Sequence, residues 1–180
     1  AVRKPLLLSG QRKFDIRLYV VIADRVPLSA WLHDGYVRFC DRTSSDDPLS
    51  RAAQIANVNV PSSERLHAVA EHYFEQAHLQ RLLATAEGAT ALRPLGLTAA
   101  RASELIRSRL ARACAQLVRA LARDLRPQAL RGAWLLLGVD IVVDESLRPS
   151  IIETNANPEL TMDSVRSDLN RQLARRLFDL

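Results

Sequence analysis

Three side chains that carry oxygen atoms interrupt two apolar runs near the C-terminal end of the sequence. Asp140 lies in residues 138–143, a run rich in valine, and Glu153 and Asn155 lie in a second run after two isoleucines. A polar segment separates the runs, so the pattern predicts an antiparallel hairpin. Acids inside apolar strands are usually paired or bound to a metal. These residues are therefore the first candidates for chemistry.

The predicted pairing of this hairpin brings the acids together. Side chains alternate along a strand, so Glu153 and Asn155 share a face, and a turn centred near Ser146 and Leu147 places Asp140 opposite Glu153. Facing carboxylates repel each other. Mg²⁺ would convert that repulsion into binding, because it takes carboxylate and amide oxygens and keeps positions for water and phosphate. Two interpretations remain open, a metal site and a surface hairpin with solvated acids.

An earlier segment is predicted to be a strand that also carries charge. Residues 14–23 alternate between apolar and polar positions, which is the period of a strand with one buried face. Asp15 and Arg17 share the other face. The strand would hold an acid and a base side by side.

A second strand pair is predicted over residues 31–40. The dipeptide Asp34-Gly35 is typical of a tight hairpin turn, and Arg38 lies just beyond it. Taken alone, Arg38 would be an ordinary cation on a hairpin.

The remaining elements are predicted to be helices. Residues 41–63 are polar and irregular, and a helix that begins after Pro61 fades before Gly88. After a connection over residues 88–97, a long amphipathic helix runs from about 98 to 125. A last amphipathic helix closes the sequence. With the strands, this gives an α+β protein.

The long helix carries a row of arginines opposite its apolar face: Arg101, Arg112, Arg119, Arg123 and Arg126. A solvated polar face explains such a row, and so does a surface that attracts an acidic peptide. The sequence has a net charge of +5, which suits an acidic polymer or a phosphate-bearing ligand. The charge indicates a class of partner and does not identify one.

Other features exclude several classes of protein. The 180 residues fit one domain with a real core. Cys40 and Cys114 form neither a metal spacing nor a disulfide framework, and no run approaches the roughly 18–20 apolar residues that span a bilayer. No hydrolase triad or zinc pair of histidines is present. We expect a soluble intracellular protein.

Several blocks in a fixed order resemble the tubulin tyrosine ligase-like family, and they cover nearly the whole sequence. The blocks are Pro5-Leu6-Leu7-Leu8-x-Gly10-x-x-Lys13-Phe14-Asp15-Ile16-Arg17, Tyr36-Val37-Arg38, Gly138-x-Asp140 and Ile152-Glu153-Thr154-Asn155-x-Asn157-Pro158. The segment Leu160-Thr161-Met162-Asp163-Ser164 is similar to the glutamylase and glycylase branches.

This resemblance implies the ATP-grasp fold, with residues 1–180 as its C-terminal lobe, a mostly antiparallel sheet with packed helices. Members join an amino acid to a protein carboxylate, usually on the acidic tail of tubulin, through an acyl-phosphate. We therefore expect an ATP- and Mg²⁺-dependent ligase that uses free glutamate, with no nucleic-acid or membrane partner. Its expected location is the cytoplasm and cytoskeleton, including a cilium, flagellum or basal body.

The resemblance also implies roles for the charged residues. Asp140, Glu153 and Asn155 match the family's Mg²⁺ positions. Arg17 and Arg38 match catalytic positions near the acceptor carboxylate and the transferring phosphoryl group, where a guanidinium fork suits paired oxygens.

The nucleotide positions implied by the resemblance lie in two parts of the sequence. Lys13 and Asp15 match nucleotide contacts, Ala1 and Val2 fall on the hinge whose backbone reads adenine, and Val142 lies in the metal-bearing strand. Without the resemblance, Lys13 and Asp15 would be an exposed ion pair on an edge strand.

The sequence also departs from the family pattern. Residues 54–60 replace a Thr-Asn-Tyr type segment that ends in Asn-Lys, and the lobe with the other phosphate-binding lysines is expected before Ala1. We therefore expect little ligase turnover from these 180 residues alone. One alternative is a non-catalytic module that binds tubulin tails, and another is a ligase with a different carboxylate substrate.

Overall fold

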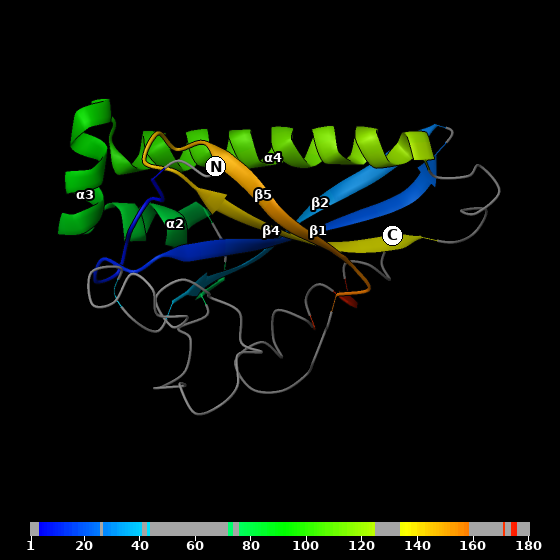
Figure 1. The fold of residues 1–180 in the computed structure, drawn as a ribbon, viewed down its shortest axis with the longest axis horizontal. Coiled ribbons are helices and arrows are strands. Elements are labelled where there is room, and N and C mark those ends of the chain that lie inside the picture. Colours follow the sequence, from blue (N-terminus) through cyan, green and yellow to red (C-terminus); the bar gives the residue numbers. More distant parts are fainter. Residues whose placement is uncertain are drawn as a thin grey trace.

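A five-stranded antiparallel sheet is the centre of the computed structural model (Figure 1). The structure describes residues 4–25, 27–40, 43, 72–73, 76–124, 134–158, 171 and 174–175. The strands are β1 (Phe14–Arg25), β2 (Leu28–Phe39), β3 (His72–Tyr73), β4 (Leu135–Val143) and β5 (Pro149–Ala156), in the spatial order β3-β2-β1-β4-β5. The expected antiparallel sheet with packed helices is confirmed.

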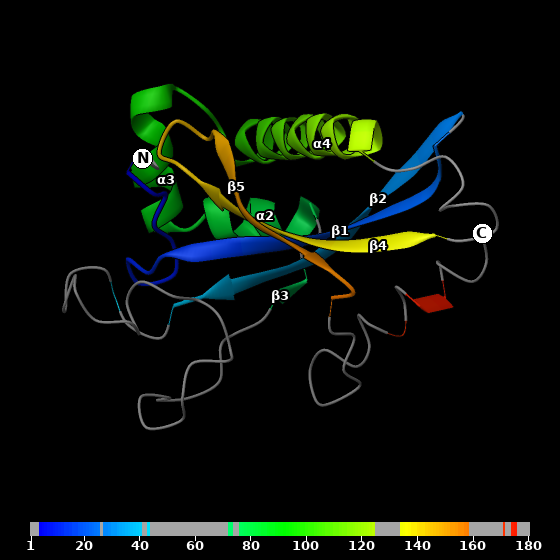
Figure 2. The same ribbon diagram turned by 45° about the vertical axis from the view of Figure 1, so that its right-hand side comes forward.

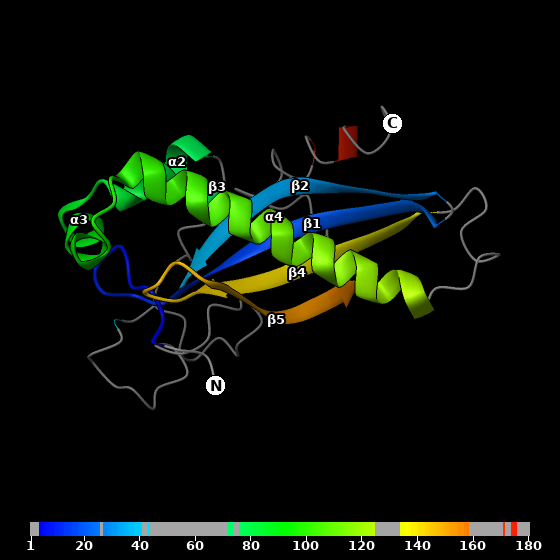
Figure 3. The same ribbon diagram turned by 90° about the horizontal axis from the view of Figure 1, so that it is seen from above.

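The helices lie on one side of this sheet. They are α2 (Gln76–Leu83), α3 (Ala86–Leu92), the 3₁₀ turn η2 (Arg93–Leu95) and α4 (Ala99–Asp124). α4 crosses the sheet along its length, while α2 and α3 lie near one end of it, as the views in Figures 2 and 3 show. The long helix predicted from about residue 98 is confirmed.

The hydrophobic core fills the space between the sheet and α4. Alternation along the strands sends Ile16, Leu18 and Val139 to this side, where they meet Ile106 and Leu110 of the helix. Each of these side chains is at most 1% exposed. Burial of one such side chain contributes about 1.5–3 kcal/mol. The other face of the sheet is therefore free to carry polar groups.

The turn predicted at Asp34-Gly35 is wrong. β2 runs through both residues, and a shift in its register with β1 beside Arg17 marks a β-bulge. A Cβ atom on Gly35 would lie 2.0 Å from the carbonyl oxygen of Arg17. Glycine is required there by the close approach of β1. The true connection between the two strands lies between Arg25 and Leu28, which pair with each other.

The predicted helix from Pro61 to Gly88 is also wrong in part. His72–Tyr73 pair with β2 as a strand, so no helix runs through them. Residues 88–97 are predicted to be a connection, but Gly88 is buried inside α3. The hydroxyl of Thr85 caps that helix by accepting a hydrogen bond from the N–H of Gly88 at 3.2 Å. The part of the predicted helix before His72 lies outside the described residues.

Two further sequence predictions concern the ends of the structure. The described residues near the C-terminus, 171 and 174–175, are helical as predicted. None of the helices in the described part of the chain is long and apolar enough to span a membrane.

Candidate active site

Two arginines and two aspartates meet at the centre of the polar face of the sheet. The register places Asp15 of β1 opposite Arg38 of β2, and Arg17 of β1 opposite Asp140 of β4. Asp15 and Arg17 are two residues apart, so both point to the same face. We call these four residues the charged cluster. Three adjacent strands contribute to it.

Hydrogen bonds connect the four side chains. Arg38 donates from Nε and Nη2 to the two carboxylate oxygens of Asp15 at 2.6 and 2.9 Å. Arg17 donates to both oxygens of Asp140, from Nε to Oδ1 and from Nη2 to Oδ2 at 2.8 Å. Arg38 also reaches Oδ2 of Asp140 at 3.0 Å. Each of the four side chains is at most 11% exposed, so water does little to screen these charges.

The two acids respond differently to this environment. For Asp140, burial raises the pKa, but hydrogen bonds from Arg17 and the charge of Arg38 outweigh it, so the net pKa is below the usual range. For Asp15, burial is the larger effect and raises the pKa, although Arg38 partly offsets it. The pKa of Arg38 is raised because its bonds to Asp15 outweigh its burial. The cluster therefore holds a firmly anionic Asp140 between two cations.

A glycine makes room for Arg17. A Cβ atom on Gly138 would lie 2.9 Å from Cβ of Pro158 and 3.1 Å from Nη1 of Arg17. Without a side chain there, Arg17 can lie across β4 toward Asp140. A glycine inside a predicted strand signals such a close approach. Gly138 carries this signal in the sequence.

The other candidate metal ligands occupy neighbouring positions on β5. Glu153 pairs with Asp140, as predicted, and Asn155 pairs with Gly138, so both lie on the face of the charged cluster. Glu153 is exposed and Asn155 is half-buried. Val142, two residues from Asp140 on β4, lies on the same face and is half-buried.

The predicted nucleotide-binding residues are only partly described. Lys13 is half-buried immediately before β1, and its carbonyl oxygen accepts a hydrogen bond from Cys40 N at 2.9 Å. The loop before it is tied to α3, because the N–H of Gly10 donates to Glu87 Oε2 at 2.8 Å. Ala1 and Val2 lie outside the described residues. Asp15 belongs to the charged cluster, a partnership with Arg38 that sequence reasoning missed.

The donor set on this face fits a hard cation. Asp140 is held anionic, and Glu153 and Asn155 add carboxylate and amide oxygens from the adjacent strand, which are the ligands Mg²⁺ prefers. Among the described residues, no group of three His, Cys, Asp or Glu side chains gathers as a metal site. A site here would depend on the amide as its third ligand.

The arginine row lies on the other side of the molecule. Arg101, Arg112, Arg119 and Arg123 are exposed on α4, whose opposite face packs on the apolar side of the sheet. Arg126 lies outside the described residues. The row is therefore separated from the charged cluster by the sheet and the helix.

Comparison with known proteins identifies relatives that are named as tubulin-modifying enzymes. The chain is 29% identical over 166 residues to the probable tubulin polyglutamylase TTLL9 of Bos taurus, covering 91% of this chain and 33% of that protein. It is 28% identical over 194 residues to the probable tubulin polyglutamylase ttll-9 of Caenorhabditis elegans, covering 99% and 40%. The tubulin glycylase 3D of Tetrahymena thermophila is 24% identical over 189 residues, covering 99% and 16%. The chain thus spans well under half the length of these curated relatives.

A model of the tubulin-tyrosine ligase family matches residues 2–180. The match includes every strand of the sheet and each residue of the charged cluster. The α+β architecture is consistent with an ATP-grasp-like fold. The chain belongs to the tubulin-tyrosine ligase family.

Proposed function

We propose that the protein is a ligase that modifies tubulin, and that this chain supplies its metal-binding and anion-binding face. The relatives are named as polyglutamylases and glycylases of tubulin, which supports this class of activity. The finer proposal is that the enzyme joins glutamate to a carboxylate on an acidic tubulin tail, using ATP and Mg²⁺, in the cytoplasm at the cytoskeleton. The convergence of Arg17 and Arg38 on Asp140 carries this proposal.

The metal would be held by Asp140, Glu153 and Asn155. A bound Mg²⁺ would act as a Lewis acid and offset the negative charge that develops at the transferred phosphoryl group. The carboxylate of Asp140 is suited to this role because its lowered pKa keeps it ionised. Glu153 is exposed on the same face, so it can turn toward a metal without leaving a buried partner.

The arginines would bind the reacting anions. The hydrogen bonds within the charged cluster use Nε and Nη2 of Arg17 and of Arg38. A guanidinium has five N–H donors, so each arginine keeps donors for a carboxylate or phosphate oxygen. Because the aspartates fix the planes of both forks, these donors are oriented before substrate arrives.

The proposed reaction has two steps. A carboxylate oxygen of the acceptor attacks the γ-phosphorus of ATP, and ADP leaves with the electron pair of the broken P–O bond. The amino nitrogen of glutamate then attacks the acyl carbon, phosphate leaves, and the nitrogen loses a proton to solvent. Arg17 and Arg38 would neutralise the acceptor carboxylate and the oxygens of the transferring group.

The test is incorporation of labelled glutamate into tubulin by the full-length protein with ATP and Mg²⁺, with labelled glycine in a parallel reaction. Trapping with hydroxylamine should convert the acyl-phosphate to a hydroxamate. Replacement of Arg17 or Arg38 with lysine should lower kcat/KM by roughly 100-fold or more. The matched control Arg93→Lys changes an exposed arginine of η2 and should leave the rate unchanged.

Two results would count against the proposal. If the wild-type protein binds tubulin but shows no Mg²⁺-dependent ATP binding, it is a non-catalytic tail-binding module. If it ligates glutamate to proteins other than tubulin at equal rates, the assignment of the acceptor is wrong. Incorporation of glycine in place of glutamate would correct the amino acid and leave the class of reaction intact.

A further inference from the structure

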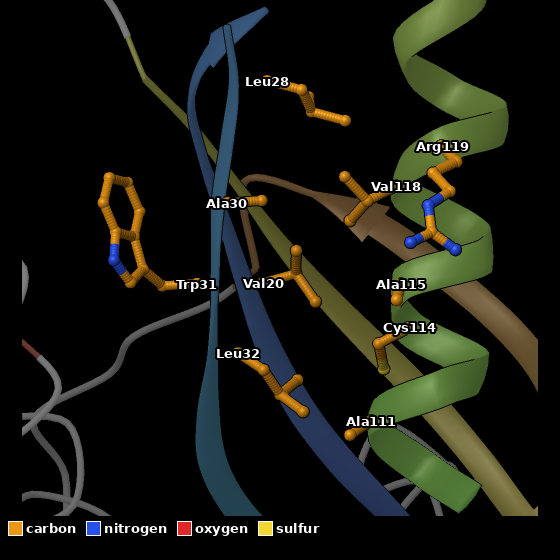
Figure 4. Close-up of a pocket in the computed structure, with 10 residues that line it drawn as sticks. All are labelled: Val20, Leu28, Ala30, Trp31, Leu32, Ala111, Cys114, Ala115, Val118 and Arg119. Carbon is orange, nitrogen blue, oxygen red and sulfur yellow. The ribbon is translucent and has the colours of Figure 1, made fainter.

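A pocket lies on the side of the sheet opposite the charged cluster, between β2 and α4 (Figure 4). It has a volume of about 220 Å³. Val20, Leu28 and Leu32 approach it from the β1–β2 hairpin, and Val118 and Arg119 approach it from the helix. Only the last of these side chains is charged.

The size and lining of this pocket fit a side chain of a partner protein. Sites for small organic ligands usually enclose roughly 300–1,000 Å³, so this pocket is small for them. Leu28 and Leu32 are 40% and 41% exposed at its edge. Contiguous exposed apolar patches with a polar rim mark sites of protein interaction or ligand binding. One large apolar side chain would fill the pocket and cover both leucines.

The helix surface above the pocket is basic. Arg112, Arg119 and Arg123 are separated by seven and four residues, so they lie in one line along α4, and all three are exposed. In the described part of the chain, none of the three forms an ion pair. Arg101 of the same helix differs, because it binds Glu104 at 2.9 Å. The line therefore offers three cations beside an apolar hollow.

We propose that this groove is a docking site for an acidic segment of tubulin, separate from the site of chemistry. The segment would place an apolar side chain in the pocket and its carboxylates along Arg112, Arg119 and Arg123. Charge complementarity favours this occupant over a neutral or basic peptide. The inference rests on the proposed function, since it assigns the groove to the same polymer that supplies the acceptor tail.

The location of the groove determines how it would act. The charged cluster faces the other side of the sheet, so a segment bound in the groove does not occupy the positions of Arg17 and Arg38. Docking would instead raise the effective concentration of the mobile tail near the reacting groups. The groove should therefore change KM for tubulin and leave kcat at saturation unchanged.

The test uses the full-length protein with the triple substitution Arg112→Glu, Arg119→Glu and Arg123→Glu. Binding to purified tubulin should weaken about tenfold or more, and its dependence on salt should become shallower. The KM for tubulin should rise in parallel, while ATP binding and kcat stay at wild-type values. The matched control is Arg81→Glu, Arg93→Glu and Arg148→Glu, which reverses the same number of exposed arginines outside α4.

A second variant tests the apolar half of the site. Ala115 is exposed at the pocket, so Ala115→Trp should fill the hollow and leave the fold intact, as thermal unfolding would verify. It should weaken tubulin binding about threefold or more without altering the salt dependence.

The outcomes separate the docking site from the proposed ligase activity. Equal weakening by both triple variants would mean that net charge alone attracts tubulin, and the docking site would be wrong. The docking site would also be wrong if neither the Arg112/Arg119/Arg123 triple nor Ala115→Trp affected tubulin binding. Displacement of tubulin from the groove by a DNA duplex would contradict it as well. If instead the wild type binds tubulin through this groove but incorporates no amino acid, the docking site stands and the ligase proposal fails.

Discussion

Replacement of Arg38 with methionine should lower the free energy of unfolding by about 3–5 kcal/mol, the usual cost of leaving one buried charge without its partner. The cluster holds two acids and two arginines, each at most 8% exposed. Without Arg38, Arg17 still neutralises Asp140, but Asp15 loses both of its hydrogen bonds. The melting temperature should fall by about 6–20 °C for a chain of this size.

Replacement of Asp15, the partner of Arg38, tests whether the two side chains act as a pair. Asp15→Leu alone should cost less, about 1–3 kcal/mol, because Arg38 keeps its 3.0 Å contact with Asp140. The double variant removes one charge of each sign, and apolar replacements of a buried pair are often close to neutral. The loss of unfolding free energy in the double variant should therefore be smaller than the summed losses of the two single variants by at least about 2 kcal/mol.

Urea unfolding of the four proteins of this cycle measures each effect, provided that the denaturant slope is unchanged. The pair Lys4–Glu145 is a control, because its side chains are 75% and 48% exposed at a separation of 2.8 Å. Lys4→Met should cost no more than about 1 kcal/mol. Additive effects of Asp15→Leu and Arg38→Met, or a cost for Arg38→Met as small as that for Lys4→Met, would refute the reasoning.

Three further predictions concern single residues. Asp140 has a lowered pKa, so its contribution to stability is complete above about pH 4 and is lost as pH falls through its folded-state pKa. The difference in stability between wild type and Asp140→Asn, measured by urea unfolding, should therefore shrink below pH 4, and a constant difference would contradict the lowered pKa. Burial raises the pKa of Cys114 to about 11, so only about 0.1% of the thiol is thiolate at pH 8. Mass spectrometry should find that iodoacetamide labels this thiol in urea but labels almost none of it in the native chain. Gly35→Ala places Cβ 2.0 Å from a carbonyl oxygen and should lower the free energy of unfolding by more than about 3 kcal/mol. Gly96→Ala, at a φ of 63° with open space around it, should lower it by only about 1 kcal/mol. Similar melting temperatures for the two variants would show that β1 can move away.

Much of the sheet could be predicted from local patterns. Alternation along residues 14–23 identified β1 and the shared face of Asp15 and Arg17, and the hairpin pattern placed Asp140 opposite Glu153 in the observed register. The alternation succeeded because side-chain period is a property of a short segment. The pairing of Asp140 with Glu153 is as predicted, but a β-bulge next to it shifts the register of the residues nearer the turn, so Ile141 pairs with Ile151.

Other predictions failed where distant contacts outweigh local preference. The Asp-Gly dipeptide at 34–35 has the composition of a turn, but the approach of β1 makes it a bulge inside β2. His72–Tyr73 fit a helical pattern, but pairing with the edge of β2 makes them a strand. Neither outcome can be read from nearby residues, because the deciding atoms lie on another strand.

The sequence by itself determined which residues are candidates for chemistry and which face of each strand they occupy. Only the tertiary structure decided their partners. Asp15 and Arg38 are 23 residues apart, and Arg17 and Asp140 are 123 apart, yet strand order makes them neighbours at one point of the sheet. The same packing put α4 on the other face, so its arginines lie away from the charged cluster. Strand order and layer position depend on long-range burial of apolar surface, which no local pattern specifies.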